Sequence, residues 1–261
     1  FPIDLDITTL NTITRDFMSD RYGGSAIACR PTISKEKLRR HGYNDFMYLN
    51  MRYHPHAPQV PGAPGLYFRP GKGRPRDWTE NRVYRAFTRL SSGIWLKMGL
   101  YVLGFSEPLS IEEWRRNDMK TMRDVWSHKI SKTVWGRGTR CSIKLRSQLG
   151  REPTQEEYEE ALYSDNKFLD VNPQEVSNAF LLGEEVFSVW TMRCVGYDTE
   201  FQKTIAQQFA EWNPPPRPPK KTKNTTRVKK EEDDESKHGN AVTRERSSRV
   251  KQKTNNLKKR Q

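Results

Sequence analysis

Apolar residues recur at helical spacing behind three helix-start signals. Residues Ser110 to Glu113 match the capping box S-x-x-E, and the apolar stripe behind them runs to Ile130. Thr154 begins a second capping box, and Asn172 precedes a proline at a first helical position. These patterns predict a helix from Ser110 through Ile130 and two shorter helices from Thr154 and Asn172. Terminal helices are predicted over residues 5–22, before Gly23-Gly24, and over residues 198–212.

Other stretches have the composition or the period of strands. Residues 66–68, 82–90 and 185–195 are rich in aromatic and β-branched side chains, and residues 94–105 read as a bent strand or hairpin with Gly99 as a bulge. Cys141, Ile143 and Leu145 alternate with polar residues, which predicts a strand with one wet face. Residues 54–65 hold four prolines and two glycines, so they form an ordered loop or a spacer.

These elements together predict an α+β fold. We expect one compact domain over residues 1–212, with a small, strongly bent antiparallel sheet or partial barrel flanked by helices. Residues 213–261 contain no Phe, Trp, Tyr, Met or Ile, so they cannot bury a core and are predicted to be a disordered tail. A polyproline spacer at residues 214–219 leads into it.

Most of the net positive charge lies in this tail. The chain carries a net charge of +14, of which the tail supplies +10 and residues 1–212 only +4. Three scattered cysteines without a CxxC pair predict a reducing, intracellular setting. We find no apolar run of about 18 residues and no signal peptide, and the chain opens at Phe1 without a Met, like a piece of a longer protein.

The sequence holds no complete catalytic, metal or cofactor motif. His54 and His56 lack the further histidine or thiolate pair that a zinc site needs. Gly71 to Arg74 is too short for a Walker A loop, and hydrolase signatures are absent. The glutamate pairs at residues 112–113 and 156–157 open predicted helices, where the helix dipole favours acids. We therefore assign no catalytic residue, metal or cofactor.

Two basic strips are the candidate binding sites within residues 1–212. They could hold a phosphate backbone if the fold brings them together, while an aromatic side chain stacks on a base. Alternatively, each strip is a solvated surface balanced by glutamates at residues 156–160 and 184–185. The first strip contains Arg69, Lys72, Arg74, Arg76, Arg82, Arg85 and Arg89, with Trp78 among them, and the second contains Arg137, Arg140, Lys144, Arg146 and Arg151.

The tail carries short basic clusters that suit a nuclear import receptor or a phosphate backbone equally well. Acidic residues 231–235 lie between them and would pair with the bases or compete with nucleic acid. A nuclear location is the resulting prediction. The clusters consist of Lys220, Lys221 and Lys223, of Lys229 and Lys230, and of Lys258, Lys259 and Arg260.

Six segments carry a resemblance to a known family: Trp95 to Gly104, Leu109 to Trp114, Trp135-Gly136, Leu149 to Thr154, Gly183 to Glu185 and Trp190 to Asp198. Through them the chain resembles a domain family of unknown function from mushroom-forming basidiomycete fungi. The likeness covers about residues 14–209 and implies a domain of that extent in an intracellular fungal setting, without implying an activity. Residues 95–103 also resemble, more weakly, a strand of small β-barrel domains that read modified bases.

From these observations we expect a non-enzymatic nuclear module that binds DNA or RNA through the basic strips and the tail. One alternative is a protein-interaction scaffold whose tail supplies the nuclear address. Another is a nuclease-like phosphoryl-transfer enzyme, for which Glu107, Glu112 and Glu113 are the carboxylates nearest to the first strip in sequence. We expect no membrane association.

Overall fold

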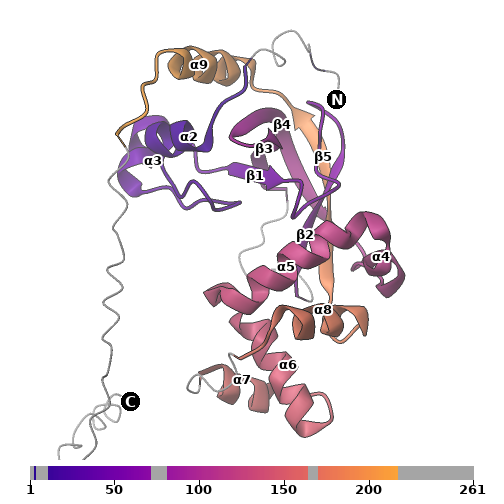
Figure 1. Cartoon of the computed structure of the whole chain (residues 1–261). Helices are drawn as coiled ribbons and strands as arrows, with labels where there is room; N and C mark the ends of the chain where they lie inside the picture. The colour runs from indigo at the N-terminus through magenta and orange to yellow at the C-terminus, as the bar shows by residue number, and fades with distance from the viewer. Residues whose placement is uncertain (1–2, 4–10, 72–80, 164–169, 217–261) are drawn as a thin grey trace, which may run out of the picture. The chain divides into compact units, whose positions relative to one another are not determined.

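Five strands form one curled half-barrel sheet in the order β1-β3-β4-β5-β2 (Figure 1). Neighbouring strands are antiparallel except β1 and β3, which are parallel. The sheet and its flanking helices confirm the predicted α+β class and the bent sheet, with this parallel pair as the one difference. The strands are β1 (Phe46–Asn50), β2 (Gly65–Pro70), β3 (Val83–Ser91), β4 (Ile94–Phe105) and β5 (Phe187–Gly196).

The structure, a computed structural model, describes residues 3, 11–71, 81–163 and 170–216. All of these residues except Pro216 belong to one compact unit, Phe1–Pro215. Lys72, Arg74, Arg76 and Trp78 of the first basic strip lie outside the described residues, as do all basic clusters of the tail.

A bulge in β4 bends the sheet at the predicted glycine. Ala86 pairs with Gly99 but Phe87 pairs with Lys97, so β4 carries one extra residue at this point. Gly99 has φ 135°, and a Cβ there would lie 2.9 Å from the sulfur of Cys194. Only glycine fits this position without strain, which confirms the predicted bulge.

One face of the sheet is covered by α2 (Arg15–Tyr22), α3 (Lys35–His41) and α9 (Thr199–Ala210) (Figure 1). Its core is mostly aromatic and includes Phe17, Tyr22 and Phe87. The N-terminal helix is shorter than predicted, because Ile13 forms a β-bridge with Trp95 and Thr14 then caps α2. Residues 5–10 of the predicted helix lie outside the described residues.

The opposite face carries a second core that includes Tyr84, Tyr101 and Trp190. The proline-rich segment folds against it, since the Tyr101 hydroxyl donates to the Ala63 carbonyl at 2.8 Å and Ala57 is buried in the same core. Residues 54–65 are therefore an ordered loop that packs on this face of the sheet, and not a spacer.

A helical layer packs on the ends of β2 and β5. Its core joins Phe68 and Phe187 of these strands to residues such as Trp114, Ile130 and Phe180. All three predicted helix starts are confirmed by reciprocal hydrogen bonds at Ser110, Thr154 and Asn172. The helices are α4 (Ile111–Arg115), α5 (Lys120–Lys132), α6 (Arg137–Leu149), α7 (Gln155–Tyr163) and α8 (Pro173–Leu181).

Two predictions in this layer are wrong. The helix from Ser110 through Ile130 is interrupted, because Arg116 adopts an extended ψ of 148° and a 3-10 turn, η1 (Asn117–Met119), separates α4 from α5. The strand predicted at Cys141 to Leu145 is the helix α6. Cys141 and Leu145 face α7 while Ile143 joins the core around Trp114, so a helix buried on two sides imitates a strand period. Within the described residues, no helix is both long and apolar enough to span a bilayer.

Candidate anion-binding groove

Arg85 of the first basic strip belongs to the core. Its guanidinium forms ion pairs with Asp45 at 2.6 Å and Asp198 at 2.8 Å, and only 8% of the side chain is exposed. It also lies 4.4 Å from the ring centre of Tyr43 and 4.8 Å from that of Phe201. Arg85 therefore holds α9 on the sheet with both of its charge partners in place.

The other described members of the first strip lie near the surface. Arg82 is exposed and donates to the Asn44 carbonyl, with its guanidinium 5.2 Å from the ring centre of Tyr84. Arg89 is half-buried and donates to the Ser91 carbonyl. Arg69 is half-buried on β2. This strip thus supplies one exposed cation among the described residues, Arg82.

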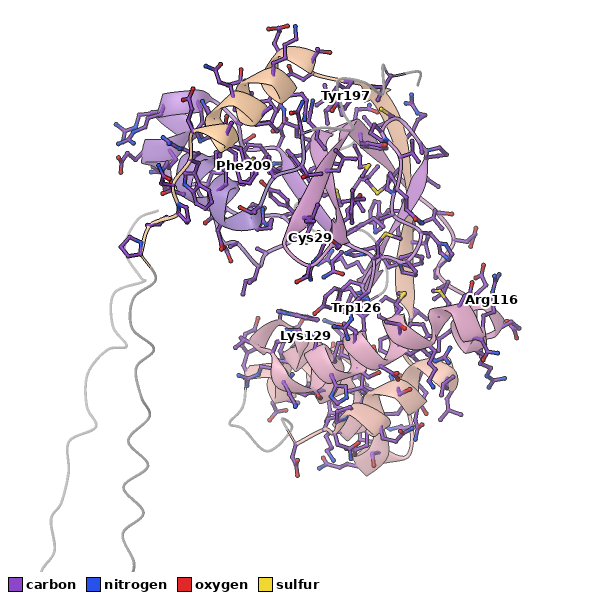
Figure 2. The ribbon with its side chains drawn as sticks, turned by 45° about the horizontal axis from the view of Figure 1, so that its top comes forward. Cys29, Arg116, Trp126, Lys129, Tyr197 and Phe209 are labelled. Carbon is purple, nitrogen blue, oxygen red and sulfur yellow. The ribbon has the colours of Figure 1, made fainter. Side chains whose placement is uncertain are left out.

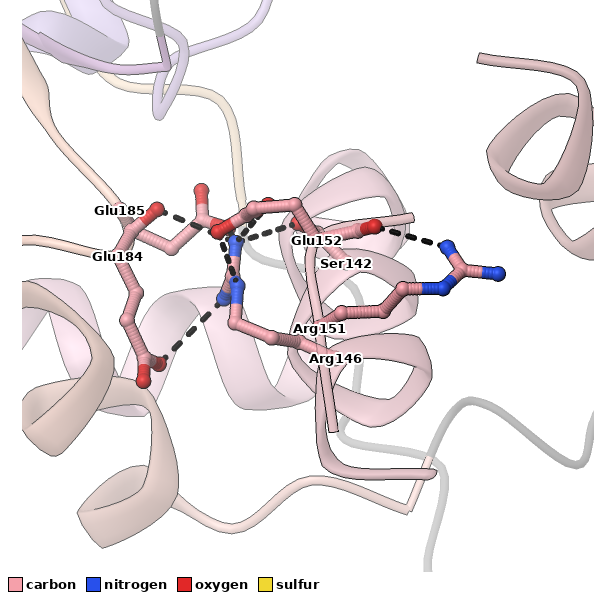
Figure 3. Close-up of polar contacts among 6 residues, drawn as sticks. All are labelled: Ser142, Arg146, Arg151, Glu152, Glu184 and Glu185. Atoms are coloured by element: carbon pink, nitrogen blue, oxygen red, sulfur yellow. Dashed lines mark hydrogen bonds and ion pairs between the residues drawn. The ribbon is translucent and has the colours of Figure 1, made fainter. Parts of the chain in front are cut away.

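The second strip lies on α6 and just after its end, in the helical layer, and three of its five cations form ion pairs with glutamates (Figure 3). Arg146 donates to Glu152 at 2.7 Å, to Glu185 at 3.2 Å and to Glu184 at 3.4 Å. Lys144 pairs with Glu175 at 3.0 Å, and Arg151 with Glu157 at 2.7 Å.

Arg140 of the same strip is buried and donates to the carbonyls of Ile130 and Thr133, while Arg137 is half-buried. The sequence has no acid between Arg137 and Arg151, but the fold brings the balancing carboxylates from outside that stretch. The two strips occupy different elements, the sheet and α6, and most of their described cations are already engaged.

A groove of about 490 Å³ lies between the turn after β1 and α5. Arg52 and Tyr53 come from the turn, and the remaining lining comes from one face of α5 and the residue after it. Its volume falls in the range of small-molecule sites, which is about 300–1,000 Å³. The helical part of the lining is Asp124, Val125, His128, Lys129, Lys132 and Thr133.

Positive charge dominates this groove. Arg52, Lys129 and Lys132 are exposed cations, His128 is exposed between them in the lining, and Asp124 is the one acid. Across the described ranges 11–71, 81–163 and 170–216, no ion pair involves any of these five side chains. The groove is therefore a cationic hollow whose charges are available to a ligand.

Tyr53 lines the groove, and two tryptophans continue from it in a row of ring contacts. The Trp126 indole donates to the Tyr53 carbonyl at 3.0 Å and meets the Tyr53 ring edge-on at 5.3 Å. Trp135 meets Trp126 at 5.6 Å, nearly perpendicular, and 55% of it is exposed. Figure 2 shows Trp126 and Lys129 on the part of α5 that faces the half-barrel.

Sequence reasoning missed this groove because α5 was considered only as an apolar stripe. A usable signal was present, since Lys120 to Lys132 contains four Lys or Arg and His128 with Asp124 as the single acid. Drawn as a helix, His128, Lys129 and Lys132 share a face one turn long. The contribution of Arg52 depends on the fold and had no sequence signal.

Two of the other candidate residues, His54 and Glu113, have structural roles. His54 is buried and accepts a hydrogen bond from the Phe68 amide at 3.3 Å, and burial lowers its pKa to about 3. Glu113 completes the cap of α4. Among the residues placed by the structure, no three His, Cys, Asp or Glu side chains gather as a metal site requires.

Comparison with curated proteins returns no match, and comparison with solved structures returns none either. A family model does match, over residues 12–208, and its description is a domain of unknown function, DUF6697. The match spans the sheet, both layers of helices and the groove, and it agrees with the extent of about 14–209 expected from the sequence. The chain therefore belongs to the DUF6697 family of domains of unknown function.

Proposed function

We propose that this domain is a non-enzymatic module that binds the phosphate backbone of a nucleic acid in the groove beside α5. The observation that carries the proposal is the set of exposed cations, Arg52, Lys129 and Lys132, that have no ion-pair partner among the described residues. Cations lining a hollow reinforce one another, because the low-dielectric walls focus their field on the ligand. Phosphate oxygens are the anions that such a field attracts along a polymer.

The α6 strip provides a comparison within the same domain. Arg146 contacts three glutamates, so a phosphate there would have to displace carboxylates that are already bound. Lys129 and Lys132 require no such exchange. The groove, and not α6, is therefore the surface of the body that we assign to nucleic acid.

Binding of labelled oligonucleotides to the full chain tests this function. The variant Lys129→Ala/Lys132→Ala removes two groove cations. The control Lys35→Ala/Arg39→Ala removes the same charge from α3, from two exposed side chains that form no ion pair among the described residues. We expect the groove variant to bind about tenfold more weakly and to reduce the salt slope by about 2 relative to the control. Equal affinity and slope for the two variants would refute the proposal, because tail charge alone then explains binding.

Exposed apolar residues favour a second function, a protein-interaction scaffold. Val134 is 88% exposed beside Trp135, in the 3-10 turn η2 (Val134–Gly136). Adjacent exposed apolar residues often mark interaction surfaces. A photoreactive amino acid at position 134 should then form a defined protein adduct in cells, and the same amino acid at the exposed position of Ile27 should not. Identical adducts from both positions would argue against the scaffold.

The nuclear location and the import-receptor partner are proposals that rest on the tail sequence, and the fungal setting rests on the resemblance. A fluorescent fusion of the full chain tests the location directly. Replacing Lys258, Lys259 and Arg260 with alanine should weaken nuclear accumulation if the last cluster is the address. Unchanged accumulation after alanine replacement of all three clusters would refute it.

A further inference from the structure

We infer that the groove takes single-stranded nucleic acid and that one base stacks on Trp135. The inference rests on the proposed function of the same groove and names its substrate class. Proteins that hold single strands combine a cationic groove along the backbone with aromatic side chains that stack on bases. Both parts are adjacent here, since the groove lining ends at Lys132 and Thr133 and Trp135 follows two residues later.

Trp135 is exposed although its neighbours are anchored. Of the Trp135 surface, 55% is accessible, whereas Trp126 beside it is half-buried, bonded to the Tyr53 carbonyl and 5.5 Å from the Phe187 ring. Tyr53 itself lines the groove. The row Tyr53, Trp126 and Trp135 therefore runs from the groove wall to an indole that is open to a ligand.

Contacts with α5 and α6 hold the turn that carries Trp135 in place. Arg140, buried on α6, donates to the carbonyls of Ile130 and Thr133, which flank the junction of α5 and η2. A Cβ at Gly136 would collide with the Ile130 carbonyl, so the turn lies directly on the helix backbone. A base can stack on Trp135 without a large ordering cost, because the indole position is set before binding.

The shape of the site favours a single strand over a duplex. The cations line a hollow between Arg52 and one face of α5, whereas proteins read a duplex by placing a protruding helix or ribbon into its grooves. Bases inside a duplex are stacked on one another and offer no face to Trp135. An unpaired strand exposes both the phosphates for the lysines and the bases for the indole.

The test compares a single strand of about 12 nucleotides with the duplex of the same sequence, each labelled and titrated with full-length protein. We expect the single strand to bind more tightly. Trp135→Ala should weaken single-strand binding by about tenfold and leave duplex binding unchanged, and Trp135→Phe should restore most of the loss. Oligonucleotide quenching of tryptophan fluorescence should shrink in Trp135→Phe although that variant still binds.

The possible results separate this inference from the function on which it rests. If binding depends on Lys129 and Lys132 but Trp135→Ala has no effect, or the duplex binds equally well, the stacking inference fails and the proposed function stands. If neither nucleic acid depends on the groove lysines and polyglutamate binds there instead, both fail and the groove holds an acidic peptide. Unchanged duplex binding by Trp135→Ala guards against misfolding as the cause of its weaker single-strand binding.

Discussion

Arg85 on β3 donates to one carboxylate oxygen of Asp198 at 2.8 Å, while the other oxygen caps α9 by accepting the Phe201 amide at 2.9 Å. The Asp198 carbonyl also accepts a hydrogen bond from the buried amino group of Lys97. Two basic side chains of the sheet therefore converge on the residue that caps α9. This network attaches α9 to the half-barrel.

Asp198→Ala should destabilise the domain by about 2–4 kcal/mol. The substitution removes a helix N-cap and takes one of the two carboxylates away from the buried guanidinium of Arg85. Denaturant unfolding measures the change. Asp118→Ala is the control, because Asp118 pairs with Arg116 at the surface, and it should change stability much less than Asp198→Ala. Equal effects would show that the network contributes nothing beyond a surface ion pair.

Lys97 should make stability rise with pH above about 7. Burial lowers the pKa of Lys97 from 10.5 to about 7, although Asp198 opposes the shift. Between these two values the unfolded chain binds a proton that the folded chain does not, so unfolding becomes harder as pH rises. The slope from one such group approaches about 1.4 kcal/mol per pH unit.

Comparing the wild type with Lys97→Met isolates this contribution from buried tyrosines and thiols that titrate at higher pH. The free energy of unfolding of the wild type, minus that of the variant, should increase between about pH 7 and pH 9. Parallel curves over this range would mean that Lys97 keeps its proton in the folded protein.

His54 should destabilise the domain in mild acid. Burial lowers its pKa from 6.5 to about 3, and its ring nitrogen accepts the Phe68 amide of β2. Below about pH 6.5 the unfolded chain therefore binds a proton that the folded chain does not bind. The free energy of unfolding decreases as the pH is lowered through this window. His54→Gln should flatten the fall between about pH 6.5 and pH 4.5, whereas the exposed control His128→Gln should keep it. A fall of the same size in both variants would assign it to other groups.

Local signals predicted the helix starts and the bulge, because each depends on residues that touch one another. Ser110 and Glu113 form a capping box within four residues, and Gly99 is needed for its own φ angle. The period of α6 misled because its buried residues serve two different cores. Cys141 and Leu145 face α7 whereas Ile143 faces the core around Trp114, and a one-dimensional pattern does not separate these directions.

The candidate site was harder to predict because charge partners are set by the tertiary fold. Arg146 appears unopposed along the sequence, yet its glutamates come from positions 152, 184 and 185. In the groove, by contrast, the fold brings cations together. Arg52 and Lys129 are 77 residues apart in the sequence, and both line the groove because the turn after β1 lies beside α5. A strongly basic stretch is therefore a poor guide to free charge in this domain.

Arg146→Ala should weaken the helical layer without changing nucleic-acid binding. Only 12% of the Arg146 side chain is exposed, and its loss leaves Glu152, Glu184 and Glu185 without their shared cation (Figure 3). We expect a loss of about 3 kcal/mol in unfolding free energy and faster amide exchange in α6 and residues 183–186. Arg146→Lys should recover only part of the loss, because one ammonium cannot replace a planar fork of five donors.

The salt dependence of this variant identifies the cause. Added salt screens the repulsion among the three carboxylates, so the difference from the wild type should shrink as ionic strength rises. A difference that does not shrink with salt would indicate lost packing of the side-chain stem instead. The salt slope of oligonucleotide binding should stay at the wild-type value, since Arg146 is already neutralised by carboxylates. A decrease of the slope by about 1 would instead show that Arg146 on α6 contacts nucleic acid.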